Sequence, residues 1–177
     1  IVHGDFNDKK FFSNLIKSKK INIIFDTGAI TQVLESLKNP YETYKTNIMG
    51  TINILEAIRK IDPKILMIYS SSDKAYGELK NKEYKENDNL FAIYPYDLSK
   101  SSSDLICQSY SKIYNLKVAI VRCGNLFGPG DFNFRRIVPE TIIRALQNKR
   151  LIIRSSGKLI RDYLYIDDAV EAYILIL

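Results

Sequence analysis

The sequence predicts an α/β fold in which the strands of a parallel sheet alternate along the chain with helices. Short apolar runs of strand length alternate with segments in which apolar residues recur at helical spacing, and polar residues follow several of the apolar runs. The chain has 177 residues, which is enough for one domain with a real core. Of these residues 46% are hydrophobic, as in a typical globular protein.

The first predicted elements are a strand, a long helix and a second strand. Residues 21–25 (Ile-Asn-Ile-Ile-Phe) form a short apolar run suited to a buried strand. In residues 41–60 the apolar side chains fall near helical spacing, and Asn39-Pro40 marks the start of that helix. Residues 64–69 are predicted to form the second strand, and the polar residues 70–92 a long loop.

The alternation continues in the second half of the chain. A helix is predicted from Pro95, which suits the first turn of a helix, to about Tyr114. An apolar run at 116–122 predicts the third strand, and glycine and proline at 127–130 predict a turn. The remaining predicted elements are a helix at 137–149 entered through Pro139, short strands at 151–154 and 162–166, and a last helix capped by Asp167 and Asp168.

Polar residues at the ends of the predicted strands indicate a binding crevice. Strands that alternate with helices imply βαβ units and a parallel sheet covered on both faces. In such sheets ligands bind beyond the carboxyl ends of the strands. Asp26, residues 70–74 and Gly124-Asn125 each follow a predicted strand, so we expect them to line one crevice.

Composition argues against several classes of protein. The net charge is +6, but the lysines are scattered and lack interleaved aromatic residues, which favours a solvated surface over nucleic-acid binding. A phosphate-bearing substrate would also suit a basic protein. Two cysteines indicate reduced thiols in a cytoplasmic protein, and no apolar run approaches the roughly 18–20 residues that cross a bilayer. No cluster has metal-ligand spacing, and His3 is the only histidine, so we expect no metal site.

The ends of the sequence indicate a piece of a longer protein. The chain begins with Ile1-Val2 rather than Met, and it ends within an apolar pattern at 173–177. We therefore expect further residues on both sides.

Tyr96 and Lys100 are the residues that point most directly to chemistry. Positions i and i+4 share one face of a helix, so the pair places a phenol beside an ammonium group. The cation stabilises the phenolate, which makes the pair an acid/base unit. A serine and an aspartate from a strand end could complete a site for alcohol oxidation. The alternative is an ordinary surface pair, because 12 of the residues are tyrosines.

Several motifs around this pair follow a family order. They lie at 2–5, 40–51, 70–77, 96–100, 122–130, 136–139 and 161–167. In these motifs the chain resembles the extended short-chain dehydrogenase/reductase superfamily, in its NAD-dependent sugar-nucleotide epimerase/dehydratase branch. Within that branch it is most similar to CDP-glucose 4,6-dehydratase, because the family's Ser/Thr-Asp-Lys stands here as Ser72-Asp73-Lys74.

The resemblance implies a Rossmann-like doubly wound parallel sheet, N-terminally truncated, with part of a small substrate-binding domain. Residues 1–123 would form a partial NAD-binding domain, whose first strand, first helix and glycine-rich phosphate loop would lie upstream of Ile1. Residues 124–177 would form part of the sugar-nucleotide-binding region, with elements that return to the sheet. The family also implies a cytoplasmic homodimer, joined through the helices that begin near Tyr41 and Pro95.

The implied reaction is dehydration of a nucleotide-diphosphate hexose to the 4-keto-6-deoxy sugar nucleotide. NAD would accept a hydride from C4 of the sugar and return it to C6. Tyr96 would take the C4 hydroxyl proton, Lys100 would stabilise the phenolate, and Ser72 would orient the hydroxyl. Lys74 would then remove the C5 proton, and Asp73 would protonate the departing C6 hydroxyl.

The resemblance also assigns binding residues. The cofactor would contact Asp5, Phe6, Gly28, Ala29, Asn47, Ser70, Tyr96, Lys100 and Cys123, and the substrate would contact Asn125, Arg136, Val138 and Arg161. The alternatives are that Asp5 caps the next helix, that Asn125 holds a turn, and that Arg161 is a surface ion-pair partner. Gly28-Ala29-Ile30 departs from the family's Ala-Ala-Gln at this point.

Three other functions stay open. A sugar-nucleotide epimerase would use the same oxidation at C4 without loss of water. A non-catalytic NAD- or nucleotide-sugar-binding module would need no intact set of catalytic residues, and a basic nucleic-acid binder would bind duplex in a salt-dependent way. The segment 161–167 resembles that of epimerases and other dehydratases, so the nucleotide base is not fixed by the sequence.

Overall fold

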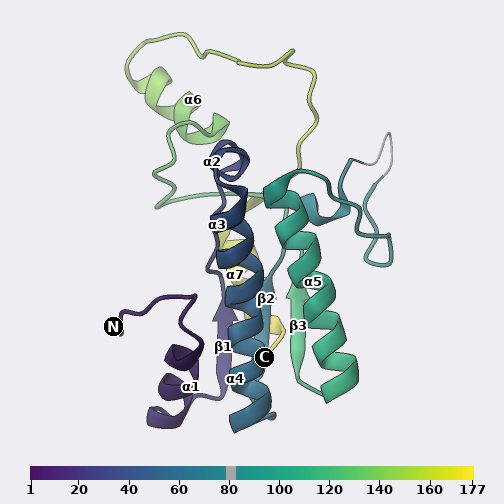
Figure 1. Cartoon of the computed structure of the whole chain (residues 1–177). Coiled ribbons are helices and arrows are strands. Elements are labelled where there is room, and N and C mark those ends of the chain that lie inside the picture. Colours follow the sequence, from purple (N-terminus) through teal and green to yellow (C-terminus); the bar gives the residue numbers. More distant parts are fainter. Residues whose placement is uncertain (79–82) are drawn as a thin grey trace. The chain divides into compact units, whose positions relative to one another are not determined.

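Three parallel strands form the main sheet, in the order β1-β2-β3 (Figure 1). They are β1 (Ile23–Asp26), β2 (Leu66–Ser70) and β3 (Val118–Val121). In the register, Asp26 lies opposite Tyr69, and Ser70 lies opposite Val121. The predicted α/β fold with a parallel sheet is confirmed.

The computed structural model describes residues 1–78 and 83–177. These residues form two compact units, Ile1–Arg122 and Cys123–Leu177, and each is described by itself. Part of the loop predicted at 70–92, residues 79–82, lies outside the described residues. Among the described residues no helix is both long and apolar enough to span a membrane.

The helices of the first unit follow the chain in regular alternation with the strands. They are α1 (Lys9–Ser18), α2 (Val33–Lys38), α3 (Pro40–Tyr44), the π-helical turn η1 (Lys45–Met49), α4 (Gly50–Ile61), the 3₁₀ turn η2 (Asp73–Tyr76) and α5 (Pro95–Tyr114). The last of these has the predicted bounds. Two of them, α1 and α2, are not among the predicted elements: α2 is only six residues long, whereas α1 begins after a capping aspartate, Asp8, that the sequence does contain.

The helix predicted at 41–60 is real but is not a uniform α-helix. It runs as α3, η1 and α4, and the π-helical turn inserts one extra residue per turn at Asn47. The carbonyl of Asn47 accepts hydrogen bonds from the hydroxyls of Thr51, at 2.8 Å, and Ser103, at 3.0 Å. Side-chain donors thus satisfy a backbone group inside the widened turn.

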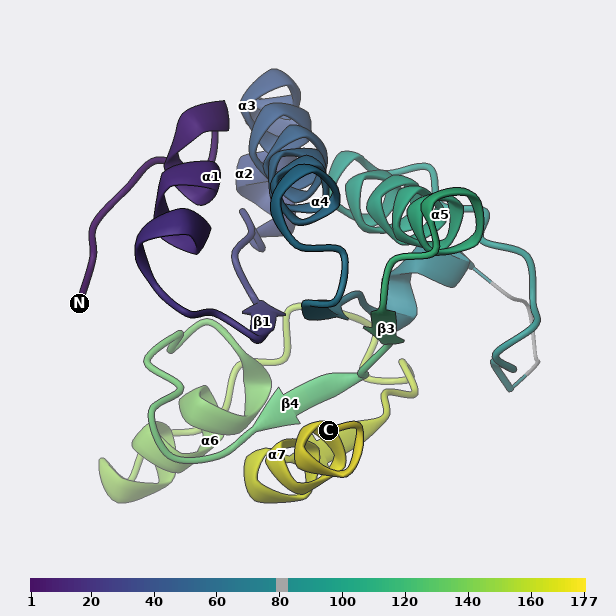
Figure 2. The ribbon, with the colours of Figure 1, turned by 90° about the horizontal axis from the view of Figure 1, so that it is seen from below.

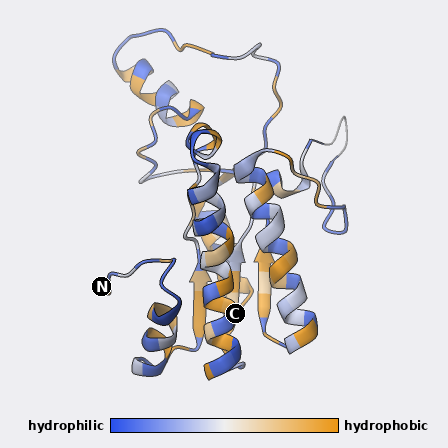
Figure 3. Ribbon diagram, in the orientation of Figure 1, coloured by the Kyte–Doolittle hydropathy of each residue, from blue (hydrophilic) through white to orange (hydrophobic). Residues whose placement is uncertain are grey.

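One face of the sheet carries the core of the first unit. Figure 2 shows α1, α4 and α5 side by side on that face, and α4 contacts both of the others. Helices placed between consecutive parallel strands reach the same face because such crossovers share one hand. Figure 3 shows β1 and β3 as hydrophobic and the helices as mixed. The buried cluster consists of Phe12, Ile16, Ile54, Leu55, Ala57, Ile58, Ile65, Met67, Tyr69, Cys107 and Leu116.

The second unit contains a small parallel sheet and two helices. Its elements are β4 (Asn125–Phe127), α6 (Ile137–Leu146), β5 (Tyr163–Tyr165) and α7 (Ile166–Leu175), with β4 paired to β5. The strand predicted at 162–166 is therefore present as β5.

Two predictions in the second unit were wrong. No strand forms at 151–154, a segment the structure describes in full; instead the Arg154 guanidinium binds the Glu140 carboxylate, with Nη2 at 2.9 Å from Oε1. The cap of α7 is Tyr165, while Asp167 and Asp168 lie in the first turn of the helix. Carboxylates at that position still favour the helix through its dipole.

Candidate active site

The candidate site lies at the carboxyl ends of β1 and β2. Asp26 is the last residue of β1 and Ser70 the last of β2. The polypeptide then continues through Ser71 and Ser72 into η2, which packs on the first half of α5. The structure thus brings together the strand ends and the helix that carries Tyr96 and Lys100.

Lys100 is the buried cation of this site. Its side chain is almost fully enclosed, and Nζ donates a hydrogen bond of 2.7 Å to the carbonyl of Ser70. Nζ also lies 5.0 Å from the centre of the Tyr69 ring, within range of a cation–π interaction. Burial lowers the pKa of Lys100, and the negative charge of Asp26 opposes that shift. A lysine with a lowered pKa in a partly polar enclosure is a frequent feature of catalytic sites.

Tyr96 lies one turn before Lys100 on the same face of α5. It is half-buried, and its backbone carbonyl accepts a hydrogen bond of 2.7 Å from the hydroxyl of Ser99. Pro95 at the start of the helix fixes the backbone of this first turn. The predicted pair of phenol and ammonium is therefore held by a rigid element.

Ser72, Asp73 and Lys74 contact one another at the start of η2. The hydroxyl of Ser72 donates to Asp73 Oδ1 at 3.0 Å and accepts from the backbone N–H of Lys74 at 3.2 Å. Lys74 Nζ lies 3.3 Å from Asp73 Oδ2, so the two predicted acid/base groups form an ion pair. Asp97, next to Tyr96, is coupled electrostatically to both; burial raises its pKa and the charge of Lys74 opposes that shift.

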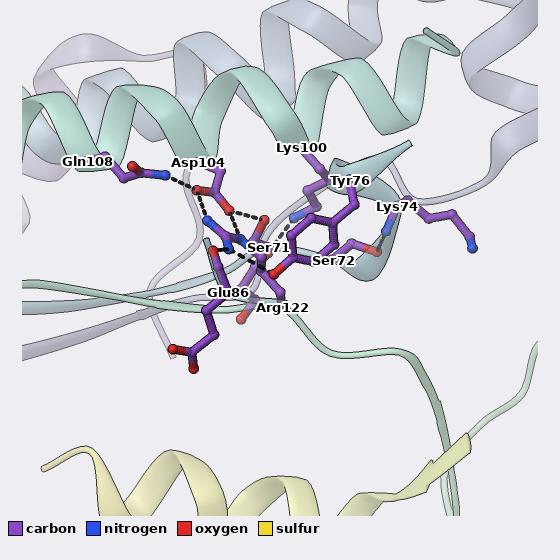
Figure 4. Close-up of polar contacts among 10 residues, drawn as sticks. Ser71, Ser72, Lys74, Tyr76, Glu86, Lys100, Asp104, Gln108 and Arg122 are labelled. Carbon is purple, nitrogen blue, oxygen red and sulfur yellow. Dashed lines mark hydrogen bonds and ion pairs between the residues drawn. The ribbon is translucent and has the colours of Figure 1, made fainter. Parts of the chain in front are cut away.

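A second buried ion pair, which the sequence did not predict, supports this strand end (Figure 4). Asp104 on α5 is fully buried and accepts hydrogen bonds from Arg122, at 2.7 and 3.0 Å, and from Gln108, at 2.8 Å. It also accepts one of 2.8 Å from the hydroxyl of Ser71. Burial alone would raise the pKa of Asp104, but these hydrogen bonds outweigh it and lower the pKa.

Arg122 joins this ion pair to the loop that follows η2. Its Nη1 donates to the hydroxyl of Tyr76, at 2.9 Å, and to the carbonyl of Glu86, at 2.8 Å. The Tyr76 ring in turn stacks on the ring of Tyr84, with 4.8 Å between the centroids. One guanidinium group therefore connects β3, α5, η2 and the loop (Figure 4).

The spacing along α5 could have revealed Asp104. Tyr96, Lys100, Asp104 and Gln108 follow one another at intervals of four residues, so each projects from the same face of the helix as the next. Of these four residues, only Tyr96 and Lys100 were predicted to belong to the site. A carboxylate one turn beyond a buried lysine, on a buried face, requires a partner, and Arg122 at the end of the next strand was available.

Asn47 holds the loop that follows β1. Its side-chain Oδ1 accepts from the N–H of Ile30 at 2.8 Å, and Nδ2 donates to the carbonyl of Ile30 at 3.1 Å and to the Ser99 hydroxyl at 2.8 Å. Both amide hydrogens are therefore engaged within the protein. The structure gives Asn47 a positioning role, and its predicted contact with the cofactor stays a prediction.

Phe6 and Gly28 lie against each other beside the end of β1. A Cβ atom on Gly28 would lie 2.5 Å from the Phe6 ring, and one on Gly50 would lie 2.3 Å from it. Two glycines thus allow the ring to pack directly on the backbone. Ala29, which follows Gly28, is half-buried.

Asp5 does not cap the next helix. That role belongs to Asp8, whose carboxylate accepts from the N–H of Lys10 at 2.8 Å. The side chain of Asp5 accepts from the N–H of Asn7 at 2.9 Å and is exposed. Its assignment to the adenine stays a prediction.

The remaining predicted residues belong to the second unit. Asn125 donates from Nδ2 to the carbonyl of Asp162 at 3.1 Å, which ties β4 to the residue before β5. Arg136 pairs with Asp131 at 3.4 Å, and Arg161 is exposed and bonds to the neighbouring carbonyl. Cys123 and Val138 are half-buried. The roles of these residues stay predictions.

Comparison with known proteins gives one family over the whole chain. A family model described as the NAD dependent epimerase/dehydratase family matches residues 1–177. The chain is 34% identical to a dTDP-D-glucose 4,6-dehydratase from Dictyostelium discoideum, over 98% of this chain and 42% of the relative. It is 29% identical to a CDP-glucose 4,6-dehydratase from Salmonella typhimurium, over 98% of this chain and 51% of the relative.

Solved structures agree with this match. A dTDP-glucose 4,6-dehydratase from Bacillus anthracis in complex with NAD has a TM-score of 0.88 and 29% identity, covering 99% of this chain and 54% of that one. A UDP-glucose 4-epimerase from Thermotoga maritima with UDP-glucose has a TM-score of 0.92 and 27% identity, covering 99% and 58%. The chain spans about half the length of the proteins it matches.

Proposed function

Because the chain belongs to the NAD-dependent epimerase/dehydratase family, we propose that it forms the catalytic part of a sugar-nucleotide 4,6-dehydratase. The resemblance inferred from the motifs is confirmed at the level of the family. The observation that carries the proposal is the contact of Ser72, Asp73 and Lys74 with one another at the start of η2, the turn that packs on α5, which carries Tyr96. The sequence Asp73-Lys74 favours the reaction of a CDP-glucose 4,6-dehydratase.

The residues at the strand ends fit a nicotinamide cofactor. A buried cation, Lys100, stands where the carboxyl ends of two parallel strands meet, which is where such folds bind dinucleotides. Lys100, Tyr96 and Ser70 would hold the nicotinamide end, and Asp5 the adenine end, with Phe6 and Gly28 as further contacts of the cofactor. When bound, NAD supplies a hydride acceptor for C4 of the sugar and a hydride donor for C6.

Tyr96 is the proposed base for the first step. As phenolate it takes the proton of the C4 hydroxyl, while Ser72 donates a hydrogen bond that orients the same hydroxyl. Lys100 stabilises the phenolate through its positive charge, and its own hydrogen bond to the Ser70 carbonyl fixes the position of that charge.

Asp73 and Lys74 are the proposed acid and base of the elimination. Removal of the C5 proton requires a neutral amine, and release of the C6 hydroxyl as water requires a protonated carboxyl. The ion pair at 3.3 Å differs from that reactive form by the transfer of one proton from nitrogen to oxygen. After Lys74 has taken the C5 proton and Asp73 has given up its own, the pair returns to the ionised form, so the proton count balances.

The test is turnover by the full-length protein with NAD and a panel of CDP-, GDP-, UDP- and dTDP-hexoses, followed by mass spectrometry. Loss of one water from one substrate supports a dehydratase and identifies its nucleotide. An unchanged mass with an altered sugar configuration supports the second candidate, an epimerase that uses Tyr96 and Lys100 alone. The absence of either change across the panel supports a non-catalytic binding module.

We also propose a homodimer built on the helices α4 and α5. Large apolar side chains are exposed on α5 and on the two elements that lead into α4, among them Leu105 on α5, Tyr41 on α3 and Met49 on η1. Light scattering from the full-length protein tests this proposal, and a monomer at micromolar concentration contradicts it.

A further inference from the structure

Asp26 is a buried carboxylate for which the proposed reaction has no use. Only 2% of its surface is exposed, and it ends β1 on the face of the sheet that the helices cover. Its oxygens accept from the hydroxyl of Thr51 on α4 and from the N–H of Gly28, each at 3.3 Å. Aspartate is almost never this deeply buried unless another charge compensates it.

The compensating charge in its surroundings is Lys100. Asp26 lies opposite Tyr69 in the strand register, so the two side chains project from the same face of the sheet. The ammonium group of Lys100 lies over the ring of that same Tyr69, at 5.0 Å from its centre, and only 4% of Lys100 is exposed. A negative group at the end of β1 and a positive group over the ring of Tyr69 thus lie on one face of the sheet, both removed from water.

The other ionisable groups that face this pair, among the described residues, are either uncharged at neutral pH or already paired. Tyr69 on β2 and Cys107 on α5 are both buried, and burial raises the pKa of each well above neutrality. Asp104 on α5 is neutralised by Arg122, as described above. Asp26 is therefore the carboxylate that can balance the positive charge of Lys100. The two charges attract each other, so each stabilises the ionised form of the other.

We propose that Asp26 is a positioning residue whose carboxylate is the counter-charge that keeps Lys100 cationic beside Tyr96. The inference rests on the proposed function, since a cationic Lys100 matters to the reaction only if Tyr96 acts as phenolate. Asp26 touches neither substrate nor reacting atoms in this role. It acts through Lys100, whose positive charge would otherwise be disfavoured by burial.

A purely structural role would have different consequences. If Asp26 served only to accept from Thr51 and Gly28, asparagine, which keeps one acceptor oxygen in the same shape, would leave the titration of Lys100 unchanged. The effect on Lys100 therefore separates the two roles.

The experiment follows Lys100 directly by NMR in the full-length protein labelled with ¹³C at lysine Cε. Its resonance is assigned by its absence in Lys100→Met. In Asp26→Asn the titration midpoint of Lys100 is expected to fall by about one pH unit or more. Asp26→Ser removes the same charge and serves if the amide is not accommodated. The control, Glu42→Gln, removes an exposed carboxylate from α3 and is expected to leave Lys100 unchanged.

Turnover supplies the second readout. The alkaline limb of the pH profile of kcat is expected to move to lower pH in Asp26→Asn by the same interval as the Lys100 midpoint. A midpoint unchanged in both Asp26 variants overturns the inference, whatever the activity. A shifted midpoint in a protein that turns over no sugar nucleotide supports the counter-charge and instead overturns the proposed function, so the two failures are distinguishable.

Discussion

The carboxylate of Asp104 and the guanidinium of Arg122 form a two-pronged ion pair at 2.7 and 3.0 Å, in a position where the carboxylate has no contact with solvent. A buried pair of this kind adds little net stability when it forms, because both groups lose their hydration. Its removal on one side is costly, since the remaining charge stays buried without a partner.

Arg122→Met is therefore expected to destabilise the protein by about 3–5 kcal/mol. Chemical denaturation of the full-length protein measures this. The control is Arg59→Met, which breaks a pair with Glu56 on the surface of α4 at 2.7 Å and should cost no more than about 1 kcal/mol. Equal losses of unfolding free energy in the two variants would show that another group balances the charge of Asp104.

Asp26 gives a pH dependence of stability with a defined sign. Burial raises the pKa of this carboxyl from 3.8 to about 6, and Lys100 and the two hydrogen bonds only partly oppose the shift. A pKa raised in the folded state contributes stability that is present below about pH 4 and is lost as the pH rises through 6. Asp26→Asn should thus be more stable than the parent above pH 6, by roughly 3 kcal/mol, and should differ little at pH 4. Thermal denaturation at both pH values checks this, and a variant less stable at pH 7 contradicts it.

Tyr96→Phe is expected to remove the base and leave the fold intact. Without a hydroxyl the C4 proton has no acceptor, so kcat should fall by about 10²–10⁴ while the unfolding midpoint stays unchanged. Tyr94→Phe is a matched control, because Tyr94 is an exposed tyrosine two residues away, at the cap of the same helix. Comparable losses of activity in the two variants would remove Tyr96 from the proposed mechanism.

Substitutions of Asp73 and Lys74 should block different steps of the elimination. In D₂O, Lys74→Ala is expected to lose both exchange of the C5 hydrogen and release of water, because the base is absent. Asp73→Asn should retain C5 exchange at a reduced rate, because Lys74 must then lose its proton to solvent, and should slow the release of water by about 100-fold or more. Mass spectrometry of the sugar nucleotide separates the two. C5 exchange at the parental rate in Lys74→Ala would assign the base to another residue.

The sequence predicted local elements and their order better than contacts between distant segments. Pro95 placed the start of α5 correctly, since this signal lies within the helix itself. The strand at 151–154 failed because its apolar residues do not reveal whether a neighbouring strand is available. The π-helical turn at Asn47 was also invisible, because it depends on hydroxyls from Thr51 and Ser103 that satisfy a backbone carbonyl.

In the candidate site, too, local motifs were predicted and contacts between distant segments were not. Ser72, Lys74 and Tyr96 were predicted from motifs that occupy consecutive or nearby positions. The pairing of Asp104 with Arg122 joins residues on α5 and at the end of β3, and the relation of Asp26 to Lys100 depends on burial and strand register. Neither relation can be recognised from the sequence before the register of the strands is known.

The spacing of Tyr96, Lys100, Asp104 and Gln108 along α5 limits how the sequence of this protein can diverge in evolution. Each residue added to or removed from an α-helix rotates everything beyond it by about 100°. A single insertion or deletion between Tyr96 and Asp104 would therefore turn Tyr96 and the buried carboxylate away from each other. In descendants of this gene, we expect α5 to keep its length in that interval, and length variation to accumulate in the loops.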